Sequence, residues 1–209
     1  MRKKGFTLAE VLITIGILGV ISALTIPQLH NRTKNANLGP QYANAIATLE
    51  NGIGTLLYEY NVKDLTQLPT AHDGIKTISG LLGKLYNDKY IRLRTFSGGP
   101  SGLPTGCSLS YSLPDKSAIG SCSTATLTVH KGNANQEMIF LSSKSVKQTN
   151  VIEGLDYFRM SLSADGMIYI PGSDYEQSSA TCSRMTGGKG CAGKVANNGW
   201  KFDDSVYSD

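Results

Sequence analysis

The chain has 209 residues, of which 40% are hydrophobic and 17% are charged, so it holds enough apolar material for one domain core. Its formal charge of +4 falls to +1 once the three basic residues at positions 2–4 are set aside, and so small a charge requires no nucleic-acid partner. No Gly-x-Ser-x-Gly elbow is present, and the three histidines lie in no nucleophile or metal motif, so we expect no enzyme.

The N-terminus consists of a short basic leader and a long apolar segment. The leader carries its three basic residues at positions 2–4 and ends at Gly5. In residues 6–26 the only charged side chain is Glu10. A helix of that length extends about 32 Å, enough to cross a hydrocarbon core of about 30 Å. The pattern therefore predicts a transmembrane helix whose N-terminus is held inside by the basic cluster.

This apolar segment does not have the form of an ordinary secretory signal. Such signals have an apolar region of about 7–15 residues, followed by a cleavage site of small residues. Here the apolar run is longer, and the small residue, Gly5, comes before it. A cut at that position would leave the apolar helix in the mature chain.

Glu10 is the charged exception within the apolar segment. A carboxylate about one turn into a membrane helix costs about 2.5–3.5 kcal/mol, so we expect it to have a partner. A cut after Gly5 would make Phe6 the first residue, and its α-amino group would supply a cation from the same chain or from a neighbouring subunit. The alternative is a glutamate near the membrane interface whose side chain reaches water.

Taken together, these features resemble the class III leader and N-terminal helix of type IV pilins and type II secretion pseudopilins. The matching positions are the leader ending in Gly5, Phe6-Thr7-Leu8 at the mature start, Glu10 as the fifth mature residue, Gly19 within the helix, and Pro27 after the apolar run. The resemblance implies that a membrane aspartyl prepilin peptidase cleaves between Gly5 and Phe6 and that the Phe6 amine is methylated. It also implies assembly into a helical fibre, in which Glu10 pairs with the Phe6 amine of the adjacent subunit.

The fold that this resemblance implies is α+β and pilin-like, with a long N-terminal helix packed on an antiparallel sheet. We expect four regions: a cleaved leader at 1–5, a transmembrane and fibre-core helix at 6–27, an amphipathic helix half at 28–61, and a globular head at 62–209. The head would carry a disulfide-bounded C-terminal loop. The implied partners are further copies of the chain, the peptidase and methyltransferase, an assembly platform with its ATPase, and the inner membrane before assembly.

The amphipathic half has a clear apolar face. Its apolar residues recur three or four positions apart, at Tyr42, Ile46, Leu49, Ile53, Leu56, Leu57 and Tyr60. We expect this face to dock on the sheet, after a kink or short break at Gly39-Pro40. If the helix is continuous from Phe6 to Tyr60 it is about 80 Å long, and its apolar end must lie in a membrane or in a fibre core.

The remaining chain predicts a short helix followed by strands and turns. The helix is expected at Asp73–Tyr86, with Asp73 as its cap, and a loop at Ser97–Gly106. The expected strands are Tyr90–Phe96, Cys107–Leu113, Ala125–His130, Met138–Ser142, Tyr157–Leu162 and Met167–Pro171. Turns are expected at Lys131–Asn135 and Ala164–Gly166, and irregular chain after Pro171.

Four cysteines lie in the part of the chain that is predicted to be outside the cell. They are Cys107, Cys122, Cys182 and Cys191. An even number of cysteines in an exported domain favours disulfides, and sequence alone leaves all three connectivities open. We favour the two sequential bridges, which would staple local loops. Zinc is the alternative, but there is no Cys-x-x-Cys, and His30, His72 and His130 are scattered.

Calcium is the one cofactor that the resemblance raises, because major pseudopilins bind it with oxygens of C-terminal loops. The candidate ligands are Asp165, Asp174, Asp203 and Asp204. Calcium requires about six to eight converging oxygens, and these residues show no EF-hand spacing or other fixed loop. We therefore favour solvated turn aspartates and expect no cofactor.

Two patterns near the C-terminus approach nucleotide or nucleic-acid sites without completing them. Residues 188–195 nearly follow the phosphate-binding loop Gly-x4-Gly-Lys-Ser/Thr, but Val195 replaces the hydroxyl that binds magnesium. The cations that could contact DNA phosphates are Lys189, Lys194 and Lys201. Trp200 is the candidate ring for stacking, but no stripe of interleaved aromatic residues accompanies these cations, so the sequence does not support DNA as a partner.

The favoured function is therefore a structural pilin or pseudopilin subunit. Its precursor would lie in the inner membrane with the N-terminus inside, and the mature subunit in a surface filament or a periplasmic pseudopilus. The alternative is a membrane-anchored binding or adhesive module, including a component of a DNA-uptake pilus. The leader is shared by all of these machines and does not distinguish them.

Overall fold

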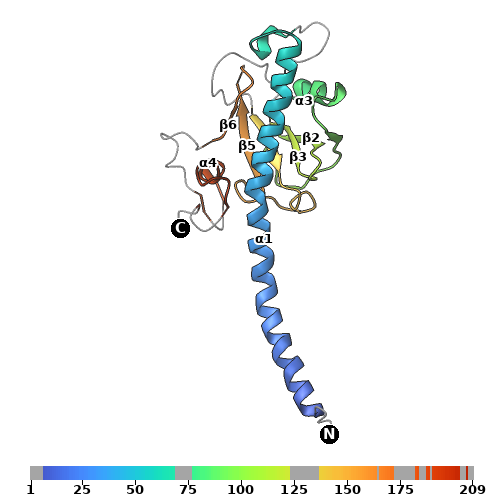
Figure 1. The fold of residues 1–209 in the computed structure, drawn as a ribbon, viewed down its shortest axis with the longest axis vertical. Coiled ribbons are helices and arrows are strands. Elements are labelled where there is room, and N and C mark those ends of the chain that lie inside the picture. The colour runs from blue at the N-terminus through green and yellow to red at the C-terminus, as the bar shows by residue number, and fades with distance from the viewer. Residues whose placement is uncertain are drawn as a thin grey trace, which may run out of the picture.

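A computed structural model describes residues 7–68, 77–122, 137–163, 165–171, 182–183, 187–188, 190–202 and 206, with the backbone alone at 24–36. One helix, α1 (Leu8–Glu59), runs the length of the molecule. Its N-terminal half projects from the head, and its C-terminal half lies across a sheet (Figure 1). The other elements are η1 (Leu65–Gln67), α3 (Ile78–Asn87), β1 (Arg94–Thr95), β2 (Ser108–Ser112), β3 (Ala118–Ser121), β4 (Glu137–Leu141), β5 (Tyr157–Leu162), β6 (Ile168–Tyr169) and α4 (Gly190–Asn197).

The strands form a six-stranded antiparallel sheet in the order β1-β2-β3-β4-β5-β6, counted over the described residues. Each strand therefore pairs with its neighbour in the chain, and every connection within the sheet is local. The register shifts between Leu109 and Tyr111 of β2, which is a bulge. A Cβ at Gly120, opposite this bulge, would overlap the Ser108 carbonyl oxygen and lie 2.7 Å from the Leu109 Cα. The close approach of the two backbones thus requires glycine. The α+β arrangement predicted from the sequence is confirmed.

The main core lies between α1 and one face of the sheet. The predicted face of α1 is buried at Tyr42, Ile46, Leu49, Ile53, Leu56 and Leu57, with Tyr60 packed against it. Tyr42 is central, because its ring centroid lies 5.4 Å from that of Phe140 and 4.6 Å from that of Phe158. Its hydroxyl donates to the Arg159 carbonyl oxygen at 3.3 Å, and burial raises its pKa. The docking of the amphipathic half on the sheet is thereby confirmed.

The opposite face of the sheet has a smaller core of its own. Alternate residues of β4 and β5 point to the two faces, so that Phe140 belongs to the main core while Ile139 and Leu141 belong to the smaller one. The other buried members are Ala118, Val151 and Tyr157, and loop residues that include Phe96 and Leu103 pack over them. Both faces of the sheet are therefore covered, by α1 on one side and by loops on the other.

Of the kink or short break predicted at Gly39-Pro40, the break is wrong, because α1 is continuous through these residues. Leu38 and Tyr42 are buried on either side of the proline, and this packing holds the helix together where the proline removes an N–H donor. Gly39 permits close packing and does not interrupt the helix. A Cβ there would overlap the Trp200 carbonyl oxygen and lie 2.8 Å from its carbonyl carbon, so glycine lets the C-terminal region approach the helix.

Two predicted elements begin later or are shorter than expected. The short helix α3 begins at Ile78, and its cap is Thr77, whose side chain accepts from the Gly80 N–H at 3.1 Å. The predicted cap, Asp73, lies outside the described residues. The strand expected at Tyr90–Phe96 is reduced to β1, two residues long, because Ile91 and Leu93 are buried in the core before the pairing with β2 begins.

The sheet contains one strand that the sequence pattern missed. β3 pairs with both β2 and β4, yet its sequence, Ala118-Ile-Gly-Ser121, has one β-branched residue and a glycine. Burial of all four residues between the two cores outweighs this weak strand propensity. The strand expected at Ala125–His130 and the turn at Lys131–Asn135 lie outside the described residues. The hairpin turn is confirmed at Gly166 (φ +85°), since β5 and β6 pair antiparallel around it.

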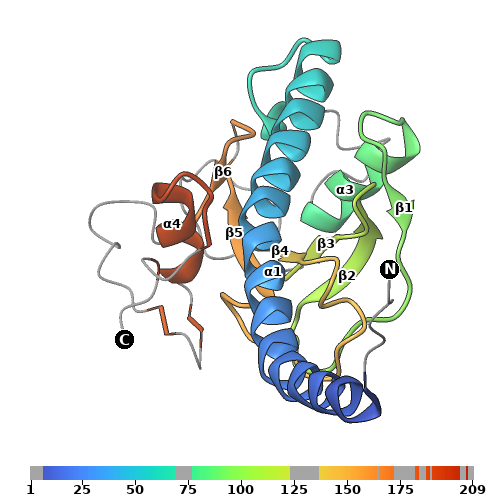
Figure 2. The ribbon, with the colours of Figure 1, turned by 60° about the horizontal axis from the view of Figure 1, so that its bottom comes forward.

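The expectation of irregular chain from Pro171 to the end is wrong, because α4 forms at Gly190–Asn197. Cys191, Ala192 and Val195 are buried on one face of this helix. The pattern did not predict a helix because two of its eight residues are glycines, which have low helix propensity. The helix packs beside α1 (Figure 2). It ends shortly before Gly199, whose positive φ of 63° suits a residue that terminates a helix.

Candidate functional site

The candidate site is the N-terminal end of α1. Thr7 is the N-cap of this helix, and its side-chain oxygen accepts from the Glu10 N–H at 3.3 Å. In return the Glu10 carboxylate accepts from the Thr7 backbone N–H and hydroxyl, each at 2.8 Å. This reciprocal arrangement is a capping box. Glu10 therefore has a partner within its own chain, two helical positions after the helix begins.

On both sides of Glu10 the helix presents apolar side chains that are at least half exposed in the described part of the chain. Their exposed fractions run from 50% at Val11 to 82% at Leu8. The exposed set is Leu8, Val11, Leu12, Ile13, Ile15, Ile17, Leu18, Val20 and Ile21. A Cβ at Gly16 or Gly19 would meet no atom within 4 Å, so these glycines are not required by contacts within the chain. Among the described residues, the segment thus forms an exposed apolar surface.

This N-terminal end matches a known sequence family. Residues 1–26 match the family described as the prokaryotic N-terminal methylation motif. The chain therefore carries the class III prepilin leader of type IV pilins and pseudopilins. No solved structure matches the chain.

The match at this end supports a precursor of the type IV pilin-like or pseudopilin kind. In general it also suggests processing by prepilin peptidase, a precursor in the inner membrane, and later residence at the surface or in the periplasm. The match covers the leader and the start of α1, and the head lies beyond it.

The structure describes only some of the residues that are predicted to act in processing and assembly. Glu10 and Gly19 lie on the exposed part of α1, whereas Gly5 and Phe6 lie outside the described residues. Pro27 lies within α1, where the structure describes the backbone alone. Thr7 has no role among the residues predicted above, although the Thr-x-x-Glu spacing of a capping box is visible in the sequence. Cleavage, methylation and the pairing of Glu10 with a neighbouring amine stay predictions.

The described residues include no helix that combines the length and the apolar character needed to cross a membrane. The span predicted at 6–27 extends over Phe6 and over positions whose side chains the structure does not describe. It stays a prediction.

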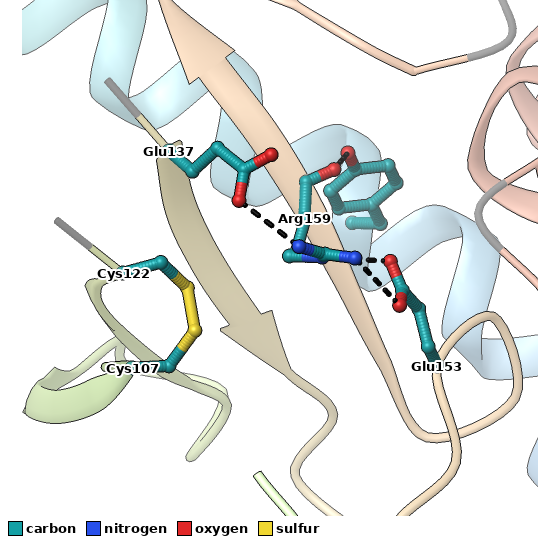
Figure 3. A network of polar contacts seen from close by, with 6 residues as sticks. Cys107, Cys122, Glu137, Glu153 and Arg159 are labelled. Carbon is teal, nitrogen blue, oxygen red and sulfur yellow. Dashed lines mark hydrogen bonds and ion pairs between the residues drawn. A yellow bond between two sulfur atoms is a disulfide. The ribbon is translucent and has the colours of Figure 1, made fainter. Parts of the chain in front are cut away.

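The two sequential disulfides favoured among the three possible connectivities are both formed. Cys107 and Cys122 join the start of β2 to the end of β3, with Cα atoms 3.7 Å apart (Figure 3). Cys182 and Cys191 tie the chain before α4 to its first turn, with Cα atoms 4.8 Å apart. All four cysteines are thereby used, and the described residues contain no group of three or more metal-ligating side chains.

An ion-pair cluster on the outer face of the sheet connects the strands to the C-terminal region (Figure 3). The Arg159 guanidinium on β5 binds both Glu153 oxygens, at 2.8 and 3.0 Å, and one oxygen of Glu137 on β4 at 3.1 Å. Its hydrogen bonds to Glu153 raise the pKa of Arg159. The Glu153 carbonyl oxygen accepts from the Gly188 N–H at 2.8 Å, next to the Cys182–Cys191 bridge. The cluster therefore holds the loop on which the C-terminal disulfide region rests.

The weaker ligand candidates do not converge among the described residues. Asp165 lies in the β5–β6 turn, where it accepts from the Ser163 hydroxyl and from the Met167 N–H at 3.2 Å. Asp174, Asp203, Asp204 and Lys189 lie outside the described residues. The ring of Trp200 packs against Tyr42 in a T-shaped contact, with centroids 5.8 Å apart. The loop that resembled a phosphate-binding motif is instead the start of α4 and carries the disulfide at Cys191.

Proposed function

We propose that the chain is a structural subunit that polymerises into a type IV pilus-like filament through the N-terminal half of α1. The observation that carries this proposal is the uncovered apolar surface of α1 beside the prepilin leader. The head already has two filled cores, and neither uses these side chains. The surface is therefore available for contacts with other molecules.

Burial of this surface contributes free energy of the size that association requires. Each Leu, Ile or Val side chain that passes from full exposure to full burial contributes about 1.5–3 kcal/mol. Nine such side chains are at least half exposed between Leu8 and Ile21, so their burial contributes on the order of 10 kcal/mol, comparable with an association cost of about 4–15 kcal/mol. Before assembly the acyl chains of the inner membrane would cover the same surface. In a filament, the helices of other subunits would replace them.

Glu10 gives the filament a defined stagger in this proposal. Cleavage between Gly5 and Phe6 exposes a new amine, which is methylated and remains cationic. A carboxylate buried among apolar helices needs such a counter-ion, because an unpaired buried charge is costly. Within the single chain, Glu10 is held by Thr7. In the filament, the Phe6 amine of an adjacent subunit would add the missing positive charge.

The processing partners follow from the same proposal. They are a prepilin peptidase with its methyltransferase activity, an assembly platform and its ATPase. The mature subunit would reside in a surface filament or a periplasmic pseudopilus. No cofactor is part of the proposal.

The intact mass of the protein from a sheared surface fraction of its host tests this function. We expect a chain that begins at Phe6, carries one added methyl group, and lacks four hydrogens because of its two disulfides. Electron microscopy of the same fraction should show filaments. An uncut chain recovered only from membranes would refute the proposal and favour a membrane-anchored binding module.

A further inference from the structure

A polar groove lies between α1 and the segment that joins α3 to β1. It is an open hollow of about 390 Å³, on the side of α1 away from α4 (Figures 1 and 2). Gly52 of α1 and Ile91 of the joining segment meet at the groove. A Cβ at Gly52 would lie 2.9 Å from the Ile91 Cγ1 atom, and Ile91 is itself buried in the main core. This close packing fixes the two walls of the groove relative to each other.

The wall on α1 carries four neutral polar side chains. They are Asn44, Thr48, Asn51 and Thr55, spaced four, three and four residues apart, so they follow one face of the helix. Asn and Thr are poorer helix formers than the Ala, Glu or Lys that suit an exposed helix face. The side chains of Asn44, Thr48 and Asn51 make no hydrogen bond to another residue in the described ranges. Helix stability therefore does not explain these residues, whereas their short amide and hydroxyl groups leave the groove open and offer donors and acceptors.

The opposite wall supplies a cation and an aromatic ring. Ile91 and Leu93 are buried on either side of Arg92, so this alternation directs the exposed arginine side chain away from the core. Among the described residues, no ion pair joins Arg92 to an acid. The Tyr90 hydroxyl donates to the Glu59 carboxylate. This bond holds the Tyr90 ring in place and gives Glu59 a partner other than Arg92.

A second open hollow, of about 610 Å³, adjoins the first. The two hollows share Ile91 and Arg92, and the second adds Lys89 to the lining. Lys89 is exposed, and the neighbouring Asp88 pairs with Lys84 at 2.8 Å. Lys89 and Arg92 therefore stand along adjoining depressions, and no described acid neutralises either of them. Each volume is in the range of about 300–1,000 Å³ that is usual for small-molecule sites.

The chemistry of the groove distinguishes between classes of partner. A protein partner usually places buried aromatic or apolar anchors at the centre of its interface, whereas this groove is lined mainly by polar side chains. A nucleic-acid strand needs a row of cations with several stacking rings, whereas the first hollow has one arginine and one tyrosine in its lining. A sugar that bears a carboxylate matches the residues present. Its hydroxyls exchange hydrogen bonds with amides and hydroxyls, and its carboxylate accepts two parallel bonds from a guanidinium.

We propose that this groove binds an acidic saccharide. Arg92 holds the sugar carboxylate, Asn44 and Asn51 bind the ring hydroxyls, and the Tyr90 ring packs on the apolar face of the sugar. In a longer chain, Lys89 attracts the carboxylate of the next sugar residue. The groove is complete within one head, so the proposal goes beyond filament assembly and does not depend on it. Uronic acid polymers and chains that end in sialic acid are the two sources of such a carboxylate.

Calorimetric titration of the full chain in detergent tests the binding and distinguishes the two sources. The probes are tetragalacturonate and sialyllactose. We expect at least one of them to bind, and its methyl ester to bind about tenfold more weakly, because the ester removes the charged acceptor from Arg92. Absence of binding by both acids would overturn the proposal. Equal binding of the acid and its ester would overturn it as well.

Arg92→Gln tests the cation, and Arg94→Gln is its matched control. Arg94 is also exposed, lies two residues further along the chain, and lines neither hollow. We expect Arg92→Gln to weaken binding of the acidic probe about tenfold, and Arg94→Gln to weaken it less than about twofold. Both variants remove one positive charge. Equal weakening would therefore indicate general attraction to a basic surface and would contradict a site at Arg92.

Asn44→Ala combined with Asn51→Ala separates binding from folding. Alanine is the better helix former, so the resistance of the full chain to denaturant should be unchanged or greater. Binding of the acidic probe should nevertheless weaken about tenfold, through the loss of two hydrogen bonds. Unchanged binding would refute the assignment of the groove. The same conclusion follows if a single-stranded oligonucleotide is retained through Arg92 and the two saccharides are not.

Discussion

Glu10 has two roles that substitutions can separate. In the single chain its carboxylate completes a capping box with Thr7, and in the proposed filament its negative charge pairs with a neighbouring amine. Glutamine at this position keeps the capping geometry and removes the charge, because Gln serves in capping boxes as Glu does. Glu10→Val removes both the capping interaction and the charge. Thr7→Ala removes the side-chain cap and keeps the charge.

The two roles differ in expected magnitude. Loss of a cap costs about 1 kcal/mol, which corresponds to about a fivefold effect on an equilibrium. Leaving a buried counter-ion without its partner costs about 3–5 kcal/mol, which corresponds to more than about a hundredfold. We therefore expect Glu10→Gln and Glu10→Val to abolish filaments alike, and Thr7→Ala to reduce them no more than about fivefold.

The assay is the amount of subunit in the sheared fraction, compared with the amount of cleaved subunit in the membrane. Cleavage should proceed in all three variants, because residues 7 and 10 lie beyond the cut and the leader is unchanged. Filaments of normal yield from Glu10→Gln, with a defect in Glu10→Val, would show that the cap and not the charge matters. That result would refute the pairing of Glu10 with the Phe6 amine.

Three further predictions concern the head and are tested by denaturant unfolding of the full chain in detergent. Gly39→Ala should lower the free energy of unfolding by about 1–3 kcal/mol, because its Cβ would overlap the Trp200 carbonyl, whereas Gly54→Ala meets no atom within 4 Å and should be neutral or stabilising. Replacing Cys107 and Cys122 by serine should cost about 3 kcal/mol for a 15-residue separation. Arg159→Ala should cost about 2 kcal/mol by leaving two half-buried carboxylates unpaired.

Periodicity predicted the parts of the fold that bury one face. The apolar positions of α1 repeat at helical spacing, and β4 and β5 alternate between two cores, so both patterns are visible in the sequence. β3 and α4 were missed for one shared reason. Each is rich in small residues and has weak intrinsic propensity, and each forms because neighbouring elements bury it. Burial by neighbouring elements does not require a periodic pattern in the local sequence, so these two elements could not be predicted from it.

The candidate site could be located in the sequence through short spacings and not through periodicity. Its residues act within a single helix turn or within a linear leader, so spacing alone relates Glu10 to Thr7 and Gly5 to Phe6. The Arg159 cluster joins residues 22 positions apart and a loop six positions away, through strand pairing that only the fold supplies.

The division of α1 into two halves connects the fold to the proposed function. Its C-terminal half is fixed by the head core around Tyr42 and by the close approach of Trp200 at Gly39. Its N-terminal half continues the same helix, so the head determines the direction in which the apolar surface projects. In the proposed filament, this continuous helix would relate the orientation of the head to that of the neighbouring subunits. The proposal therefore predicts that Gly39→Ala disturbs filament regularity as well as stability, because it alters the packing that fixes the head on the helix.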